Sequence, residues 1–494
     1  MGNVADLGFL LPRHGPRSVR RRDGAVRSAT NPASRPKAAL TTAPPRRAHE
    51  PAQTMGLSVL LREASFGRAF DRAARELAGW LEITPHDAGA RLDFASLLLL
   101  AGDRKSGLEM QAMALAQTQV YRRVFGNGRG LRVLAFLAPG DLAANTPLDY
   151  LLEASDVDLT LVYCNGPPPA FEDLPDHDVA ILAVNRSEET ADLLSQLQGV
   201  FDDWPRPVVN GRPERIAALT PNRLSATLAG HRRLACPDTR RLSRRRLLAA
   251  TRSTSPEPWD GPLFPVVIRP VAAETGRQPE KVDLIGALDA CLAQIPDGDV
   301  EVAAFYDYSG QDGLFRKFRV AVIDGKPHID HVAVSPHWRA RYCSLASLDW
   351  GLGDRTQEAR LMATFTETFA LRHRVAFDTL VEAVQLDYFD IDCAESIDGR
   401  LLVFEAGVAM LTHAADPPHL HAMRAPAASR ISAAFVAALT ARAARRADAP
   451  SDLGAARPVA ACGVTASSAL AAGPTGRTAP ERAGADGSAV SPQE

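Results

Sequence analysis

The chain has 494 residues, which is too long for one ordinary domain and predicts roughly two to four folding units. Its formal net charge of -2 excludes a globally basic nucleic-acid binder, and the sequence has no run of about 18 apolar residues that would span a bilayer. We therefore expect a cytoplasmic protein with no membrane partner and no specific nucleic-acid partner.

The two ends of the chain are expected to be disordered. Residues 1–55 are rich in Arg, Pro, Ala and Thr and have almost no apolar periodicity, so they cannot bury enough surface to offset the entropy of ordering. Residues 441–494 are rich in Ala, Gly, Pro and Ser, which predicts a second disordered tail. The sequence leaves open whether translation begins at Met1 or at Met55.

Residues 56–125 have a helical pattern. Apolar residues recur there mostly at steps of three and four, and Asp87 follows a proline at a position where it would cap the next helix. Two antiparallel helices joined by a short turn at Gly102 resemble one tetratricopeptide repeat. Such a segment would be either a helical cap on the next domain or a docking surface for a protein partner, and the sequence leaves both open.

Residues 130–220 alternate between short apolar runs and helical stretches. The runs at 131–137, 158–163 and 178–184 are typical of buried strands, and 207–210 is a further strand candidate. Helical stretches are expected at 148–154 and 187–197. This alternation predicts a small α/β domain with a parallel sheet.

Residues 221–440 have an α+β pattern. Strands are expected at 265–269, 300–306, 318–323 and 401–404, and helices at 284–293, 357–374 and 376–384. The pairs Asp324-Gly325 and Asp398-Gly399 predict tight hairpin turns. A basic run at 240–246 is expected on a helix.

The second hairpin carries two carboxylates. Asp392 lies near the end of one strand and Glu405 lies on the returning strand, so their side chains are expected side by side. Hard oxygen ligands of this kind suit Mg²⁺, which binds through one or two carboxylates plus substrate phosphates. The alternative is two unrelated carboxylates on a solvated hairpin, but Glu405 follows four apolar residues, where an unpaired charge would be costly.

This hairpin resembles the metal-binding strand pair of the ATP-grasp superfamily, which includes glutathione synthetase and the RimK-type ligases. Other segments follow in the order that the superfamily has. Residues 264–270 resemble the strand that ends in a phosphate-binding cation, and Arg269 occupies that position. Residues 271–282 lie where a glycine-rich flap would cover the phosphates.

The resemblance continues through the hinge that would bind adenine. Glu301 to Phe305 resemble that hinge, with the backbone near Ala304 expected to contact the base. Residues 305–319, followed by a histidine–tryptophan pair at 337–338, look closer still to a bacterial branch that joins a tetratricopeptide-like N-terminus to an ATP-grasp domain. This similarity implies nucleotide contacts for Phe305, Asp307 and Lys317, and a catalytic phosphate-binding or carboxylate-binding role for Arg319.

The resemblance implies an α+β ATP-grasp fold, preceded by a small α/β pre-ATP-grasp domain and an N-terminal helical segment similar to a tetratricopeptide repeat. It also implies ATP and Mg²⁺ as cofactors, metal binding by Asp392 and Glu405, and a ligase that joins a carboxylate to an amine through an acyl phosphate. Two residue patterns depart from the superfamily: Gly407 stands where an Asn is common, and the flap at 271–278 contains one glycine. The alternative is therefore a degenerate ATP-grasp protein that binds nucleotide, or serves as a scaffold through its helical segment, without turnover.

Overall fold

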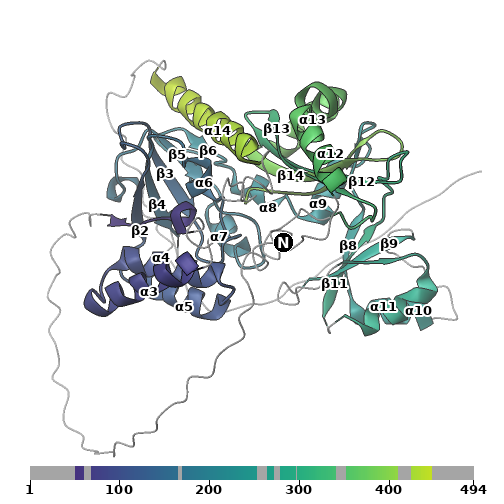
Figure 1. Ribbon diagram of the computed structural model, residues 1–494, viewed down its shortest axis with the longest axis horizontal. Helices are drawn as coiled ribbons and strands as arrows, with labels where there is room; N and C mark the ends of the chain where they lie inside the picture. Colours follow the sequence, from purple (N-terminus) through teal and green to yellow (C-terminus); the bar gives the residue numbers. More distant parts are fainter. Residues whose placement is uncertain are drawn as a thin grey trace, which may run out of the picture. The chain divides into compact units, whose positions relative to one another are not determined.

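The structure of the protein is a computed structural model. It describes residues 51–60, 68–164, 170–252, 264–271, 279–295, 298–340, 352–409 and 424–447, which build three sheets with flanking helices (Figure 1). The disorder predicted for the two ends falls mostly on residues outside these ranges. None of the helices in the described part of the chain combines the length and apolar character that a bilayer crossing requires.

The helical segment contains α3 (Arg68–Ile83), α4 (Ala88–Leu100) and α5 (Arg104–Leu115). The predicted cap is confirmed, because the Asp87 side chain accepts a hydrogen bond from the backbone N–H of Ala90 at 2.9 Å.

The predicted helical range of 56–125 is wrong at its end. Residues Val120–Val124 form strand β2, in which Tyr121 is fully buried while its neighbours are more exposed. These five residues pair antiparallel with β4 (Asp158–Tyr163), which is the pattern of a strand and not of a helix. Strand β1 (Ala52–Gln53), within the range predicted as a disordered tail, pairs with β2 in parallel.

The helical segment packs directly on the first sheet and its connections. Asp93 of α4 accepts hydrogen bonds from the backbone N–H groups of Met55 at 2.6 Å and Gly56 at 3.1 Å. Asp149, at the start of the first sheet's helix α6 (Leu148–Leu151), accepts one from Leu57 at 3.0 Å. The sequence left open a helical cap on the next domain and a docking surface for a protein partner, and this packing supports the helical cap.

The first sheet has six strands in the order β1-β2-β4-β3-β5-β6. Its remaining strands are β3 (Arg132–Leu137), β4 (Asp158–Tyr163), β5 (Val179–Leu182) and β6 (Val208–Val209). These four strands are parallel, as predicted, and β2 adds antiparallel to β4. The helical elements that follow α6 along the chain are η1 (Phe171–Asp173), α7 (Ala191–Gln196), α8 (Pro213–Ala217) and α9 (Pro221–Leu228).

The second sheet is antiparallel, with the strand order β10-β9-β11-β8. Its elements are β8 (Thr239–Ser243), α10 (Arg244–Arg252), β9 (Val266–Pro270), β10 (Glu280–Val282), η3 (Ile285–Ala287), α11 (Leu288–Ala293) and β11 (Asp299–Ala304). The helix predicted for 240–246 is wrong in its first half, because Arg240 and Arg241 lie in β8. There the buried Leu242 alternates with more exposed neighbours and joins a small core that belongs to this sheet alone.

The third sheet has the strand order β13-β12-β14-β15-β7. Its strands are β7 (Leu234–Ala235), β12 (Phe315–Ile323), β13 (Lys326–Ser335), β14 (Tyr388–Glu395) and β15 (Leu401–Gly407). Both predicted hairpins are confirmed by the pairing of β12 with β13 and of β14 with β15. The helix predicted at 357–374 is divided into α12 (Leu352–Ala363) and a π-helical turn, η4 (Thr366–Ala370), and α13 (Arg374–Val384) follows.

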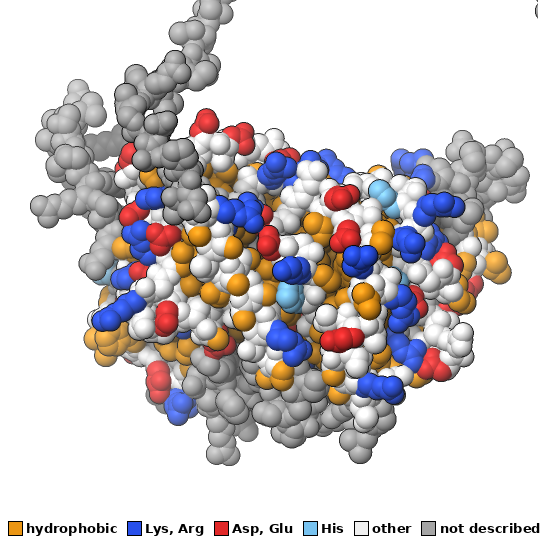
Figure 2. All heavy atoms as spheres, turned by 90° about the horizontal axis from the view of Figure 1, so that it is seen from above, with side chains coloured by type: hydrophobic (Ala, Val, Ile, Leu, Met, Phe, Trp, Pro, Cys, Tyr) orange, Lys and Arg blue, Asp and Glu red, His pale blue; other side chains and the backbone are white. Residues whose placement is uncertain are grey.

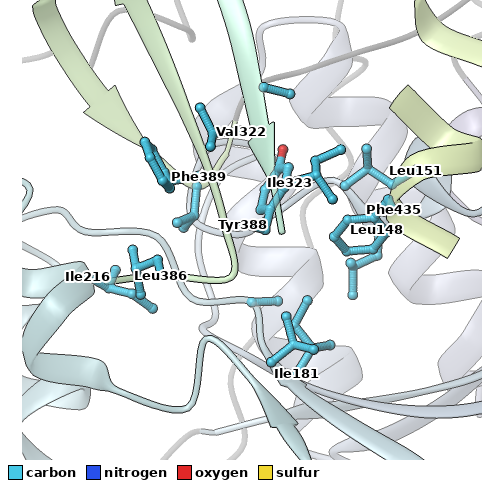
Figure 3. Close-up of a cluster of buried hydrophobic side chains, with 14 of the residues drawn as sticks. Leu148, Leu151, Ile181, Ile216, Val322, Ile323, Leu386, Tyr388, Phe389 and Phe435 are labelled. Carbon is cyan, nitrogen blue, oxygen red and sulfur yellow. The ribbon is translucent and has the colours of Figure 1, made fainter. Parts of the chain in front are cut away.

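Helix α14 (Arg424–Ala447) was not predicted, and its last turns lie in the range expected to be a disordered tail. It contributes Phe435 to a core that spans the first and third sheets (Figure 3). In this core Ile181 of β5 lies in the same cluster as Val322 of β12 and Tyr388 of β14. The α/β layer and the third sheet are therefore held together by continuous apolar packing.

A polar joint reinforces this packing. The side-chain oxygen of Asn210 accepts hydrogen bonds from the backbone N–H groups of Asp387 at 2.9 Å and Tyr388 at 3.0 Å, and its side-chain nitrogen donates to the Tyr388 carbonyl at 2.7 Å. Asn210 adopts a left-handed backbone with a φ of 54°, which Asn tolerates better than most residues.

Charged groups of both signs are interspersed on the face that Figure 2 presents. This mixture agrees with the net charge of -2 over the whole chain.

Candidate functional site

The predicted carboxylate pair is brought together by the third sheet. Asp392 of β14 lies directly opposite Glu405 of β15 in the strand register, and Arg319 of β12 lies opposite Asp392 on its other side. Residues directly opposite each other in an antiparallel pair point to the same face of the sheet. Arg319, Asp392 and Glu405 therefore share one face, and Lys317, two residues before Arg319 on β12, lies on it too.

Asp392 is held by two cations. The Lys317 ammonium lies 2.6 Å from its Oδ2, and the Arg319 Nε donates to its Oδ1 at 3.1 Å. Only 4% of the Asp392 side chain is exposed. Burial pushes the pKa of Asp392 upward, but the charges and hydrogen bonds of Arg319 and Lys317 outweigh it, so this pKa lies well below its usual range. Asp392 is thus a carboxylate near neutral pH.

Glu405 faces a cation from the second sheet. The Arg269 Nη1 of β9 lies 3.9 Å from the Glu405 Oε2, and the Arg269 Nε lies 4.0 Å from the Oε2 of Glu301. Glu301 lies opposite Arg269 in the pairing of β9 with β11. These side chains are partly exposed, so the contacts are loose and are screened by solvent. Arg269 of the second sheet therefore lies beside Glu405 of the third.

The predicted adenine hinge is only partly free to bind a base. The backbone N–H of Ala304 donates to the Asp238 carbonyl at 3.0 Å, and that of Phe305 donates to the Pro265 carbonyl at 2.9 Å. These two amides are already used, so a base contact at Ala304 or Phe305 would have to use other backbone atoms. The Asp307 side chain accepts from the backbone N–H of Ser309 at 2.9 Å, which indicates a turn-stabilising role.

The Phe305 ring lies between a cation and another aromatic ring. The Lys281 ammonium is 4.4 Å from the centre of the Phe305 ring, and the Trp338 ring meets it edge-on at 5.8 Å between centres. The Trp338 carbonyl accepts a hydrogen bond from the Tyr308 hydroxyl. A planar ligand beside the hinge would therefore meet an aromatic and cationic wall.

Arg186 was not predicted as a member of this site, and Glu301 was expected only as the start of the hinge. Asp390 was the alternative to water as a third metal ligand in place of an Asn at position 407. Glu301 stands out in hindsight, because it is polar and lies between the buried Val300 and Val302. Arg186 follows the apolar run of β5 by a few residues, and its proximity depends on how the first sheet packs on the third. That packing left no local signal in the sequence.

The donor set fits Mg²⁺ only together with ligands from a substrate. Asp392 and Glu405 supply carboxylate oxygens, but the described residues contain no cluster of three or more His, Cys, Asp or Glu side chains that would hold a metal ion. A Cβ built on Gly407 would lie 3.5 Å from the Oδ1 of Asp390, so Asp390 lies beside the position where the superfamily commonly has Asn. Two carboxylates plus phosphate oxygens and water are an ordinary Mg²⁺ environment.

The predicted flap falls mostly outside the described residues, which omit 272–278. The end of the flap range forms β10 (Glu280–Val282), which pairs antiparallel with β9. Glu280 also receives an ion pair from Arg339 at 2.8 Å, near the aromatic wall described above.

No protein-family model matches this sequence, and no curated protein matches it. Among solved structures, a RimK-domain ATP-grasp protein from Sphaerobacter thermophilus is similar at 16% identity and a TM-score of 0.35, covering 62% of this chain and 99% of that one. A D-alanine–D-alanine ligase from Bacillus anthracis complexed with ATP has 13% identity and a TM-score of 0.37, covering 64% of this chain and 99% of that one. The ATP-grasp ligase PsnB complexed with a minimal precursor has 14% identity and a TM-score of 0.35, covering 63% and 99%. At these identities and TM-scores, the similar structures assign no function to this chain.

Proposed function

We propose that this chain is an ATP- and Mg²⁺-dependent ligase that joins a carboxylate to an amine through an acyl phosphate. The observation that carries the proposal is the face shared by Lys317, Arg319, Asp392 and Glu405, with Arg269 reaching it from the second sheet. Carboxylates for a divalent cation and cations for phosphates alternate on this face.

The chemistry explains why such a face is useful. Joining a carboxylate to an amine is uphill in water, so the carboxylate must first receive a phosphoryl group from ATP. Mg²⁺, when bound, would neutralise phosphate charge and polarise the phosphoryl oxygens. Little covalent work is left for the protein, whose part is to position the reactants and to stabilise charge.

Both carboxylates of the site contact cations that a bound metal ion would replace. Asp392 is neutralised by Lys317 and Arg319, and Glu405 is approached by Arg269. Mg²⁺ held by the two carboxylates would compete with these cations for the carboxylate oxygens, and the cations could then contact phosphate oxygens. In this proposal Asp392 and Glu405 hold the metal, Arg269 and Lys317 hold phosphates, and Arg319 stabilises the phosphorylated carboxylate.

Thermal unfolding with and without Mg-ATP tests the proposal. Mg-ATP at a concentration a hundred times its dissociation constant should raise the free energy of unfolding by roughly 2.7 kcal/mol. Glu405→Gln should abolish this Mg-dependent stabilisation, because it removes the negative charge and one oxygen of one of the two carboxylates that would hold Mg²⁺. The exposed Glu214→Gln on α8 is the matched control and should respond like the wild type. Full stabilisation and turnover in Glu405→Gln would refute the metal assignment.

A second candidate is nucleotide binding without turnover. It is favoured by Gly407, which supplies no side-chain ligand, and by the engagement of both Asp392 oxygens with cations. This candidate expects measurable Mg-ATP binding with no phosphate release across a broad panel of carboxylate and amine substrates. Phosphate release that depends on one such pair would exclude it.

A protein partner at the helical segment is the remaining candidate. Trp80 is 50% exposed and Ile83 is 78% exposed at the end of α3, and Met113 of α5 is 52% exposed. Because α4 contributes to the main core, deletion of the segment would disturb the fold, and point substitutions are the suitable test. A co-purifying protein should be lost from Trp80→Ser with Ile83→Ser, while Mg-ATP binding is kept.

A further inference from the structure

Arg186 connects the first sheet to the candidate site. It follows the fully buried Ala183 and Val184, just beyond the carboxyl end of the parallel strand β5. Ligands of open α/β sheets commonly bind beyond the carboxyl ends of the strands. The neighbouring Asn185 accepts a hydrogen bond from the backbone N–H of Val408, directly after β15, at 3.4 Å.

The contacts of Asn185 place Arg186 near the carboxylates of the site. The Asn185 Oδ1 would lie 3.7 Å from a Cβ built on Gly407, and the Oδ1 of Asp390 would lie 3.5 Å from the same point. Gly407 itself is two residues after Glu405 on β15. Arg186 of the first sheet therefore lies near the end of β15, close to the predicted metal ligand Glu405.

Arg186 is a partly buried charge whose side chain is incompletely hydrogen-bonded. Its Nε is buried and has no hydrogen-bond partner among the described residues. Burial lowers the pKa of Arg186, while the nearby charges of Glu405, Glu301 and Asp390 raise it and that of Arg269 lowers it. An arginine remains protonated under such conditions, so a positive charge with an unused donor faces this site.

We propose that Arg186 is a further phosphate-binding residue, which donates hydrogen bonds to the terminal phosphate of the bound nucleotide. This inference rests on the proposed function, because it uses the same nucleotide site. Arg186 and Arg269 both interact with the charge of Glu405, and a metal ion on Glu405 would remove the charge that balances them. An anionic group would then be needed near the two guanidinium groups, whose planar donors match phosphate oxygens.

The terminal phosphate and a substrate carboxylate are both oxyanions, and a comparison of two nucleotides distinguishes them. Calorimetric titration with Mg-ADP and with a non-hydrolysable Mg-ATP analogue isolates the contribution of the terminal phosphate. Arg186→Gln should weaken binding of the ATP analogue by roughly ten- to a hundredfold, as expected for a hydrogen bond between charged groups. Its affinity for Mg-ADP should stay within about threefold of the wild type.

Two further variants control for charge and for folding. Arg186→Lys should recover part of the lost affinity for the ATP analogue, since it keeps the charge but not the planar donors. Arg129→Gln, an exposed arginine in the β2–β3 connection of the same sheet, should bind both nucleotides like the wild type. Circular dichroism and thermal unfolding of each variant establish that it is folded before titration.

The outcomes separate this inference from the proposed function. If the wild type binds both nucleotides and Arg186→Gln binds them unchanged, or weakens both equally, the inference is overturned and the nucleotide site stands. If Arg186→Gln misfolds, Arg186→Lys is the deciding variant. If Arg186→Lys binds both nucleotides with wild-type affinity, the inference is overturned; if only its affinity for the ATP analogue falls, the inference is supported. If the folded wild type binds neither nucleotide, the proposed function and the inference both fail.

Discussion

Removal of Arg319 is the sharpest test of the electrostatic arrangement at the site. Arg319→Met removes one cation from the buried Asp392 and keeps the Lys317 ammonium at 2.6 Å. Breaking a buried ion pair by removing one partner costs about 3–5 kcal/mol, and the retained Lys317 places the expected loss at about 3 kcal/mol. Urea unfolding followed by tryptophan fluorescence and circular dichroism measures this loss.

A matched control lies on the same strand. Arg316→Met breaks the ion pair with the half-exposed Asp312, a contact expected to be worth about 0.2–1 kcal/mol. The double variant Arg319→Met with Asp392→Asn should recover part of the stability lost in Arg319→Met, because no buried carboxylate is left underpaired. A loss in Arg319→Met no larger than in Arg316→Met, with no recovery in the double variant, would refute the assignment of Asp392 as a buried charge that depends on its cations.

Three other predictions concern a buried carboxylate of the helical segment, a glycine of the candidate site and the polar joint at Asn210. Burial raises the pKa of Asp93 from 3.8 to about 7, so the folded state favours the protonated carboxyl group. The wild type should therefore lose stability relative to Asp93→Asn as the pH rises from 4 to 7, as measured by urea unfolding at each pH. Gly407→Asn should be tolerated, since its Cβ meets no atom closer than 3.5 Å, and should raise the affinity for Mg-ATP in calorimetry by adding an amide ligand. Asn210→Ala should lose about 2–3 kcal/mol in urea unfolding by breaking the joint to Asp387 and Tyr388, and Asn210→Gly, which tolerates the φ of 54°, should lose less.

Each of these has an outcome that contradicts it. Parallel pH profiles for the wild type and Asp93→Asn would show that the buried carboxylate does not titrate between the two pKa values. Weaker Mg-ATP binding in Gly407→Asn would show that the site has no room for a third ligand. Equal losses in Asn210→Ala and Asn210→Gly would show that the left-handed backbone contributes no strain.

The sequence predicted those parts of the fold that depend on local patterns. The Asp398-Gly399 turn fixed a hairpin, and the hairpin placed Asp392 opposite Glu405, as the pairing of β14 with β15 confirms. Strand β8 was mistaken for a helix because its residues are mostly exposed and only Leu242 is buried, so the sequence has no alternation that would indicate a strand. Arg186 could not be predicted, since its place beside the site is set by packing between distant segments.

The roles of the site residues were less predictable than their positions. A strand was predicted at 300–306, and β11 ends at Ala304, but the partners of the Ala304 backbone N–H group depend on which strands lie beside it. Asp392 was expected to bind a metal ion, and no sequence pattern indicated that two cations of β12 would contact it. Charge compensation of this kind arises between strands that are far apart in the chain.

The second sheet has a core of its own, built from residues such as Ile268, Leu288 and Val302, while the first and third sheets share another. Cooperative opening of a protein follows such divisions, because a segment can unfold or shift without disturbing apolar contacts it does not share. Amide hydrogen exchange should therefore reveal two classes of slow amides, with those of β9 and β11 exchanging together and independently of those of β12 and β14. A ligand that binds between Arg269 and Glu405 would merge the two classes, since each opening would then have to break the same set of contacts.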